Sequence, residues 1–256
     1  MPDHARPTKV LVVVPTYQEA DNIGPTLDRV LLADDRVDVL VVDDGSPDGT
    51  ADVVAARPEH GERVHLLRRA GKDGLGAAYR AGFAWGRSRG YDVLVEMDAD
   101  LSHPADRLPA LLAALECGAD LAIGSRYVRG GGTEGWPWRR RLLSRGGNTY
   151  IRLALRLGVA DATAGYRALR ADLLERIDVG SLVSNGYCFQ VETTLRSVRA
   201  GAVVAEVPIT FVDRAAGTSK MGTDIVAEAL WRVTAWALAD AVAAAARRRP
   251  GSRTGA

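Results

Sequence analysis

Short apolar runs alternate with helix-length segments through the first half of the chain, and this alternation constrains the fold more than any other feature. The runs are rich in valine, leucine and isoleucine, and they cover residues 10–14, 37–42, 64–67, 93–97 and 121–123. Strands that are apolar on both faces are typical of buried parallel sheets, in which helices connect one strand to the next. We therefore predict an α/β fold, with a Rossmann-like, mostly parallel central sheet and helices on both faces.

Helices are predicted between these runs, at residues 22–33, 50–57, 74–89 and 104–116. Pro104 would stand in a first helical turn, where proline is tolerated. After residue 123 the pattern changes to a Gly-, Arg- and Trp-rich loop, which a helix at about residues 142–157 follows. The segment 203–211 is typical of two strands interrupted by Pro208, which suits a sheet edge or a bend.

The last long segment, residues 223–249, is rich in alanine and is predicted to form an amphipathic helix. Glu228, Arg232 and Asp240 interrupt its apolar residues, so it lacks the roughly 20 apolar residues of a membrane span. It either packs on its own domain or docks on a membrane or a membrane partner. We expect a flexible N-terminus at residues 1–8 and a disordered tail at residues 250–256.

Charge and cysteine content narrow the functional classes. The net charge of +1 gives no reason to expect nucleic acid as a partner. Cys117 and Cys188 are too few for a zinc site or a disulfide framework, which favours a reducing compartment. Residues 1–8 lack the apolar core of a signal peptide, so we expect a cytoplasmic protein.

Four polar loops follow the predicted strands, at residues 15–19, 43–49, 68–76 and 98–103. In open α/β sheets the ligand binds beyond the carboxyl ends of the strands, so these loops should line one crevice. The first loop contains no glycine, which excludes the Gly-x-Gly-x-x-Gly turn of a dinucleotide-binding fold there and argues against a dehydrogenase.

Asp98 and Asp100 end the fourth apolar run and are separated by one residue. Side chains at positions i and i+2 of an extended chain point the same way, so both carboxylates could bind one cation. Oxygen ligands suit Mg²⁺ or Mn²⁺, and Mg²⁺ bound by one or two carboxylates completes its shell with water and substrate phosphates. The alternative is that Asp98 caps the next turn and Asp100 is solvated.

Asp43 and Asp44 end the second run, and their carboxylates could accept hydrogen bonds from a base or from ribose hydroxyls. The alternative is a turn in which Asp48 caps the next helix. That alternative accounts for Pro47 and Gly49 but does not account for two adjacent aspartates at a strand end.

Cationic and aromatic residues mark two further regions. Lysine occurs three times in the chain, and Lys72 and Lys220 both stand near glycines in loops of a phosphate-binding type. The loop at residues 130–141 combines glycines, arginines, Trp136 and Trp138, which suits a membrane interface or a mobile lid. The alternative is that tryptophan fixes this loop in the core.

Six short motifs stand in order along the chain: Pro15-Thr-Tyr-Gln-Glu19, Val42-Asp-Asp-Gly-Ser-Pro-Asp-Gly-Thr50, Lys72-Asp-Gly-Leu-Gly76, Met97-Asp-Ala-Asp-Leu-Ser-His-Pro104, Gly124-Ser-Arg-Tyr-Val128 and Gly217-Thr-Ser-Lys220. This set resembles glycosyltransferase family 2, with the GT-A fold, and within it the polyprenyl-phosphate (dolichol-phosphate) mannosyltransferases. The resemblance identifies residues 9–222 as a catalytic domain. It implies transfer of mannose from GDP-mannose to a polyprenyl phosphate, assisted by Mg²⁺ or Mn²⁺.

The resemblance also implies roles for particular residues. The nucleotide sugar is expected to contact Pro15, Tyr17, Glu19, Val42, Asp44, Lys72, Asp98, Ala99, Asp100, Arg126, Arg214 and Lys220. Asp98 and Asp100 would bind the metal, and Ser102 is a candidate third ligand, because some relatives carry glutamine there. Arg140 and Ser144 would receive the acceptor phosphate.

Catalysis of this kind needs no general base. A lipid phosphate is already anionic near neutral pH, because its second pKa is ~6, so it can attack directly. Departure of the nucleotide diphosphate is the difficult step, and a metal held by Asp98 and Asp100, together with Arg126, would stabilise the developing charge. A single displacement would invert the sugar and give a β-linked mannosyl phosphate.

Many relatives carry carboxyl-terminal transmembrane helices, which we do not expect in this chain. We therefore expect peripheral contact with the inner face of the cell membrane or a separate membrane-protein partner, through the helix at residues 223–249.

Two alternative functions are another family 2 transferase with a glucosyl or aminosugar donor and a non-catalytic protein that binds nucleotide sugars. A glycosidase is disfavoured, because its two carboxylates flank the sugar at ~5 Å or more, whereas Asp98 and Asp100 should point one way.

Overall fold

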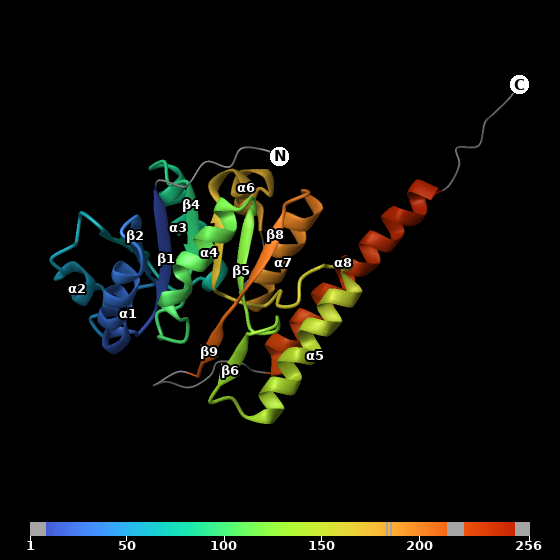
Figure 1. Cartoon of the computed structure of the whole chain (residues 1–256), viewed down its shortest axis with the longest axis horizontal. Helices are drawn as coiled ribbons and strands as arrows, with labels where there is room; N and C mark the ends of the chain where they lie inside the picture. The colour runs from blue at the N-terminus through green and yellow to red at the C-terminus, as the bar shows by residue number, and fades with distance from the viewer. Residues whose placement is uncertain (1–8, 183, 185, 214–222, 249–256) are drawn as a thin grey trace, which may run out of the picture.

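The central sheet has seven strands in the order β3-β2-β1-β4-β7-β5-β8 (Figure 1). The computed structural model describes residues 9–182, 184, 186–213 and 223–248. The strands of this sheet are β1 Val10–Thr16, β2 Val37–Asp43, β3 Val64–Arg68, β4 Val93–Glu96, β5 Leu121–Ser125, β7 Arg167–Arg170 and β8 Val204–Pro208. All neighbouring pairs are parallel except those of β7, which runs antiparallel to β4 and to β5. The predicted α/β fold with a mostly parallel sheet is confirmed.

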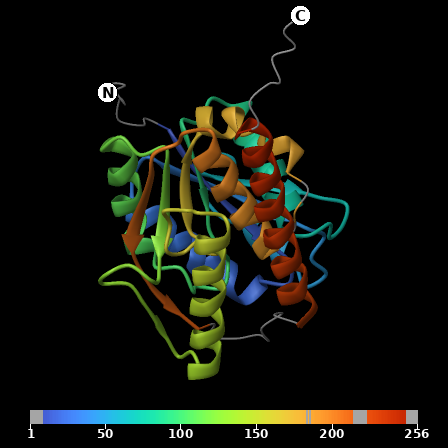
Figure 2. The ribbon, with the colours of Figure 1, turned by 90° about the vertical axis from the view of Figure 1, so that its right-hand side faces the viewer.

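Helices cover both faces of the sheet, and Figure 2 shows α4 on one side of the strands and α7 on the other. The helices are α1 Ala20–Ala33, α2 Thr50–Ala55, α3 Leu75–Arg87, α4 Leu108–Glu116, α5 Trp138–Ala154, α6 Ala171–Arg176, α7 Tyr187–Arg199 and α8 Thr223–Arg248, with 3-10 turns η1 Ala105–Arg107 and η2 Val179–Ser181. Alternate residues of β1 show why the apolar runs are continuous. Leu11 and Val13 are buried in the core formed with α3 and α7, whereas Val12 is buried in the core formed with α1 and α4.

Helix α3 packs closely against the sheet because two of its residues are glycines. A Cβ atom at Gly82 would lie 2.4 Å from Cγ1 of Val13, and one at Gly86 would lie 2.5 Å from Cδ1 of Leu94. Contacts this short are strongly repulsive, so a larger residue would force the helix away from the sheet. The two glycines therefore fix α3 against β1 and β4.

Two predicted helices start four residues away from the expected position, whereas the bounds of the first three differ by at most two residues. The helix expected from residue 104 starts with the 3-10 turn η1, and α4 begins only at Leu108. The helix expected at residues 142–157 begins earlier, at Trp138, and ends at Ala154. Pro137 adopts an extended conformation at its N-cap, and the arginines that follow are good helix formers, so the helix extends into the predicted loop.

The remaining strands lie around Pro208 and the Trp-containing loop. Pro208 ends β8, which is an edge strand of the sheet, so the prediction from its proline is confirmed. Two short strands, β6 Gly132–Glu134 and β9 Thr210–Val212, form a separate parallel pair. This pair fixes part of the predicted loop at residues 130–141.

Helix α8 packs beside α5 and α7, so one of the two predicted arrangements, packing on its own domain, is confirmed (Figure 1). Val233 is buried in the core, but Trp231 and Leu238 are exposed to solvent. Among the residues of α8 whose side chains are described, apolar residues occupy both its packed and its outer sides. Within the described residues, none of the helices has the length and apolar character needed to cross a membrane. The expected flexible N-terminus and disordered tail lie outside the described residues.

Candidate active site

Asp43 joins the end of β1 to the end of β2 and to the loop that follows β2. Its carboxylate accepts hydrogen bonds from Thr16 Oγ1 at 3.0 Å and from Ser46 Oγ at 2.5 Å. Asp43 is thus an internal brace in the structure, whereas the sequence allowed it a place at a base or a ribose. Asp44 is buried beside it and accepts a hydrogen bond from Arg69 Nη1 at 2.7 Å. Burial raises the pKa of Asp44, and the Arg69 guanidinium opposes this rise.

The predicted nucleoside-binding residues of the first loop lie at the same sheet edge. Tyr17 and Glu19 are half-buried, and Lys72 Nζ lies 4.4 Å from the centroid of the Tyr17 ring. Gln18 has a φ of 61°, and its N–H donates to Ser46 Oγ at 3.0 Å, which joins the first loop to the second.

Two predicted contacts of the nucleotide, Val42 and Pro15, belong to the strands themselves. Val42 is fully buried in the core against α3, and Pro15 is half-buried near the end of β1. The predicted Arg214 and Lys220 lie outside the described residues. The structure thus brings together the described members of the predicted nucleoside site, with Val42 beneath its surface.

Asp98, Ala99 and Asp100 follow β4 directly. Asp98 is half-buried, whereas Asp100 is 4% exposed, so the alternative of a solvated Asp100 is wrong. Asp100 Oδ1 accepts hydrogen bonds from the N–H of Ser102 at 3.1 Å and from its Oγ at 2.5 Å. The next helical turn has Pro104 at its N-cap, so Asp98 does not cap it.

The backbone around Ala99 is held from α1. Thr26 Oγ1 donates to the carbonyl of Ala99 at 2.8 Å, and both residues are buried. This bond fixes the segment between the two carboxylates against a rigid helix.

His103 holds the backbone of Asp98, a role that was not predicted from the sequence. The N–H of Asp98 donates to His103 Nδ1 at 3.0 Å, and Nε2 lies 3.9 Å from Asp98 Oδ2. The buried imidazole stacks on Tyr166, with ring centroids 5.1 Å apart, and meets the edge of Phe211. A histidine three residues after an Asp-x-Asp sequence was the only signal for this role.

The residues after β4 fit a divalent cation of the Mg²⁺ or Mn²⁺ type. Among the described residues, no group of three or more His, Cys, Asp and Glu side chains could hold a metal ion. Two carboxylates from the chain are what such a cation uses when water and phosphate oxygens supply its other ligands. The hydroxyl of Ser102 donates to Asp100, so in this structure it orients a candidate ligand.

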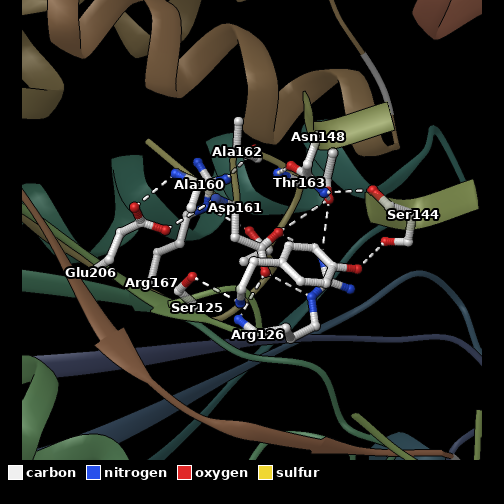
Figure 3. A network of polar contacts seen from close by, with 12 residues as sticks. Ser125, Arg126, Ser144, Asn148, Ala160, Asp161, Ala162, Thr163, Arg167 and Glu206 are labelled. Atoms are coloured by element: carbon white, nitrogen blue, oxygen red, sulfur yellow. Dashed lines mark hydrogen bonds and ion pairs between the residues drawn. The ribbon is translucent and has the colours of Figure 1, made fainter. Parts of the chain in front are cut away.

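Arg126 lies in a buried ion pair that the sequence did not reveal (Figure 3). Its Nε and Nη2 atoms donate to the two carboxylate oxygens of Asp161, at 2.8 Å and 2.7 Å, and its backbone N–H donates to the same carboxylate at 2.9 Å. The Arg126 side chain is 7% exposed and that of Asp161 is fully buried. Arg126 was predicted as a cation for the donor, and here Asp161 balances its charge.

Aromatic rings surround this guanidinium. Its carbon lies 5.3 Å from the ring centroid of Tyr127, 5.4 Å from that of Trp136 and 5.8 Å from that of Phe211. Trp136 is buried, as the core alternative for the loop predicted, whereas Trp138 is 62% exposed. The two tryptophans therefore lie in different environments.

Arg140 and Ser144, the predicted acceptor residues, both lie on α5. Arg140 Nη1 donates to Asp213 Oδ1 at 2.8 Å, and its guanidinium carbon lies 3.9 Å from the ring centroid of Trp136. Ser144 Oγ accepts a hydrogen bond from the hydroxyl of Tyr127 at 2.6 Å. Because Tyr127 follows Arg126 directly, the structure brings the acceptor candidates and the donor candidate Arg126 into one network.

A second buried pair lies beneath the Asp98 segment. Glu96 and Arg167 face each other across β4 and β7, and both are fully buried. Burial raises the pKa of Glu96 to about 7, although Arg167 opposes this rise. Arg167 donates to the carbonyls of Ala162 and Ala164, each at 2.6 Å, so it holds the turn that carries Asp161.

Residues 11–178 match Glycosyl transferase family 2, which covers more than half of the chain. The chain belongs to this family and is a glycosyltransferase, so the predicted family and enzyme class are confirmed. It is 52% identical over 242 residues to polyprenol monophosphomannose synthase of Mycolicibacterium smegmatis, covering 93% of this chain and 90% of that protein. It is also 53% identical over 231 residues to undecaprenyl-phosphate mannosyltransferase of Micrococcus luteus, covering 90% of this chain and 95% of that protein.

Solved structures share the fold. Glucosyl-3-phosphoglycerate synthase from Mycobacterium tuberculosis, in complex with Mn²⁺, uridine diphosphate and glucosyl-3-phosphoglycerate, superposes with a TM-score of 0.63. The identity is 21%, and the match covers 88% of this chain and 77% of that chain. At this identity the likeness supports the GT-A-like architecture alone.

Proposed function

We propose that this glycosyltransferase moves mannose from GDP-mannose to a polyprenyl phosphate and inverts the anomeric carbon. The observation that carries the proposal is the pair Asp98 and Asp100 at the end of β4, at the same sheet edge as Asp44 and Tyr17. The two relatives named above, each about half identical to this chain, support mannose as the sugar and a polyprenyl phosphate as the acceptor.

A divalent cation fits this site. Asp98 and Asp100 would hold Mg²⁺ or Mn²⁺, which when bound supplies positive charge to the leaving diphosphate. The chain's own contribution is orientation: His103 and Thr26 hold the backbone of the two carboxylates, and Ser102 holds the side chain of Asp100. Side chains held in this way lose little freedom when the substrate binds.

The acceptor supplies the nucleophile. A phosphate monoester is already ionised near neutral pH, because its second pKa is ~6, so no side chain needs to remove a proton. Arg140 would pair with the acceptor phosphate through a planar fork that matches phosphate oxygens, and Ser144 would donate a hydrogen bond. In this structure Arg140 Nη1 donates to the carboxylate of Asp213. Binding of the acceptor would therefore replace this carboxylate with a phosphate as the partner of Arg140.

Peripheral contact with the inner face of the cell membrane would deliver the lipid to this site. Trp138 and Leu142 lie four residues apart on α5 and are exposed, and Arg139, Arg141 and Arg145 around them are exposed as well. Apolar side chains surrounded by arginines favour an anionic bilayer surface, at ~1 kcal/mol per charge. Sedimentation with vesicles of phosphatidylglycerol should therefore exceed that with phosphatidylcholine, and Trp138→Ser should weaken it.

The test of the reaction uses purified protein, Mn²⁺ or Mg²⁺, radiolabelled GDP-mannose and a polyprenyl phosphate. An acid-labile, lipid-soluble product is expected, and its absence with both metals would refute the proposal. GDP and UDP sugars are compared by thermal shift, because a ligand at 100 times its Kd stabilises the folded state by about 2.7 kcal/mol. Stabilisation by UDP-glucose alone would favour the glucosyl alternative.

A further inference from the structure

A network of partly buried hydrogen bonds runs from the turn at residues 160–163 to helix α5 (Figure 3). The turn carries Asp161, which holds Arg126, and α5 carries the acceptor candidate Ser144. Two residues that have no role in the proposed function, Thr163 and Asn148, make the connection between them.

Thr163 lies at the centre of this hydrogen-bond network. Its Oγ1 accepts a hydrogen bond from Arg126 Nη2 at 2.9 Å and another from Asn148 Nδ2 at 2.9 Å, and it donates to Asp161 Oδ1 at 3.3 Å. A hydroxyl has one hydrogen and two lone pairs, so these three contacts use its full capacity. The hydroxyl therefore has one favourable arrangement, and it places Arg126 and Asn148 together.

Asn148 is 3% exposed and binds the turn in both directions. Its Nδ2 donates to the carbonyl of Ser144 at 3.1 Å and to Thr163 Oγ1, and its Oδ1 accepts from the N–H of Thr163 at 3.3 Å. A side-chain amide that both donates to and accepts from the same residue fixes the distance and the orientation between two segments. Asn148 therefore fixes α5 relative to the turn at the level of Ser144.

The turn itself is held to the sheet, so α5 is the part whose position depends on this link. Glu206 on β8 accepts hydrogen bonds from the N–H groups of Ala160 at 2.7 Å and of Asp161 at 3.0 Å. Arg167 on β7 donates to the carbonyl of Ala162. By contrast, α5 has a largely exposed outer side, including Leu142 and Leu143.

We infer that Thr163 and Asn148 are positioning residues. They hold Ser144 on α5 at a fixed distance from Arg126, and this sets the distance between the acceptor phosphate and the donor diphosphate. This inference rests on the proposed function. Displacement by about 1 Å between reacting groups can cost on the order of 100-fold in rate, so a small shift of α5 would be measurable.

Thr163→Val tests the inference, because valine keeps the shape of threonine and removes the hydroxyl, whereas Thr163→Ser keeps the hydroxyl. Initial rates are measured with GDP-mannose and a short-chain polyprenyl phosphate, each varied separately, and GDP binding is titrated directly. Thr163→Val should lower kcat/KM for the acceptor about 10–100-fold, with the Kd for GDP changed less than about twofold. Thr163→Ser should restore most of the acceptor kcat/KM.

Thr234→Val provides a matched control, because Thr234 lies on α8 and its hydroxyl contacts the same helix, α5. Thr234 Oγ1 lies 2.7 Å from the hydroxyl of Tyr150 on α5, at an exposed position outside the Thr163 network. Loss of this hydroxyl should leave the acceptor kcat/KM unchanged. If Thr163→Val does not fold, as judged by circular dichroism, Asn148→Ala replaces it under the same criteria.

Hydrogen exchange of residues 138–148 gives a readout that does not depend on turnover. Exchange there should be faster in Thr163→Val than in Thr163→Ser or Thr234→Val. If the wild-type protein transfers no mannose, the proposed function fails, and the exchange pattern still decides whether the link holds α5. If the wild-type protein is active but Thr163→Val matches Thr163→Ser in rate and in exchange, or weakens GDP and acceptor equally, the inference alone is overturned.

Discussion

Replacing Asp161 with asparagine perturbs the buried ion pair between Asp161 and Arg126. Asparagine keeps the shape of the side chain, but it removes the negative charge and turns an N–H group toward the N–H groups of Arg126. The carboxylate accepts three hydrogen bonds from Arg126, at 2.7–2.9 Å, and the pair is 7% and 0% exposed. Removing one partner of a buried pair leaves an uncompensated charge, which costs about 3–5 kcal/mol.

The size of this loss can be judged against the whole protein. The free energy of unfolding of a domain is about 5–15 kcal/mol, so Asp161→Asn should lower it by a large fraction. Urea unfolding, followed by tryptophan fluorescence, should show a clearly lower midpoint with an unchanged slope. Arg126→Met in the Asp161→Asn background should recover part of the loss, because the unpaired charge is gone.

Asp240→Asn is the matched control. Asp240 pairs with Arg199 at 2.6 Å, but the two side chains are 48% and 44% exposed. Exposed pairs contribute about 0–1 kcal/mol, so this variant should unfold almost as the wild type does. A loss below about 1 kcal/mol for Asp161→Asn, equal to the control, would refute the reasoning from burial.

Three further predictions concern the metal site, the packing of α3 and the buried acid. Asp98→Asn should abolish mannose transfer while circular dichroism and the urea midpoint stay close to those of the wild type; retained transfer would exclude a role in holding the metal. Gly82→Ala should cost about 1–3 kcal/mol in urea unfolding, because its Cβ would meet Val13, whereas Gly24→Ala, with nothing within 4 Å, should not destabilise the protein. The pKa of Glu96 rises from 4.5 to about 7 on folding, so the folded state binds the proton more tightly and wild-type stability should fall as pH rises through that range. Glu96→Gln should flatten this fall between pH 5 and 8, and an unchanged slope would contradict the raised pKa.

The sheet was largely predictable because its strands are buried on both faces and therefore apolar throughout. The runs around Val12, Val39 and Val95 carry that signal in consecutive residues. The place of β7 between β4 and β5 was not predictable, because its pairing with Glu96 and Ile123 involves residues far away in the sequence. Strand bounds thus follow from local composition, whereas strand order follows from long-range packing.

The site was predictable where it follows a strand end and not where it depends on remote partners. The position of Asp98 and Asp100 at a strand end was predictable because a buried strand stops just before them. Asp161 was missed, because it lies 35 residues from Arg126 and nothing local distinguishes it from a turn residue. His103 was missed because a buried histidine is more often a packing residue than a support for its neighbour's backbone.

The antiparallel strand β7 also has a consequence for the order of folding. Residues 10–96 supply β3, β2, β1 and β4, but the other edge of β4 is paired only when residues 167–170 arrive. As the chain emerges from the ribosome, N-terminal parts fold first, so β4 would be an open edge strand during synthesis. Until β7 closes that edge, the segment that ends in Asp98 and Asp100 would be exposed to strand pairing with other nascent chains, and pairing with β7 removes this open edge.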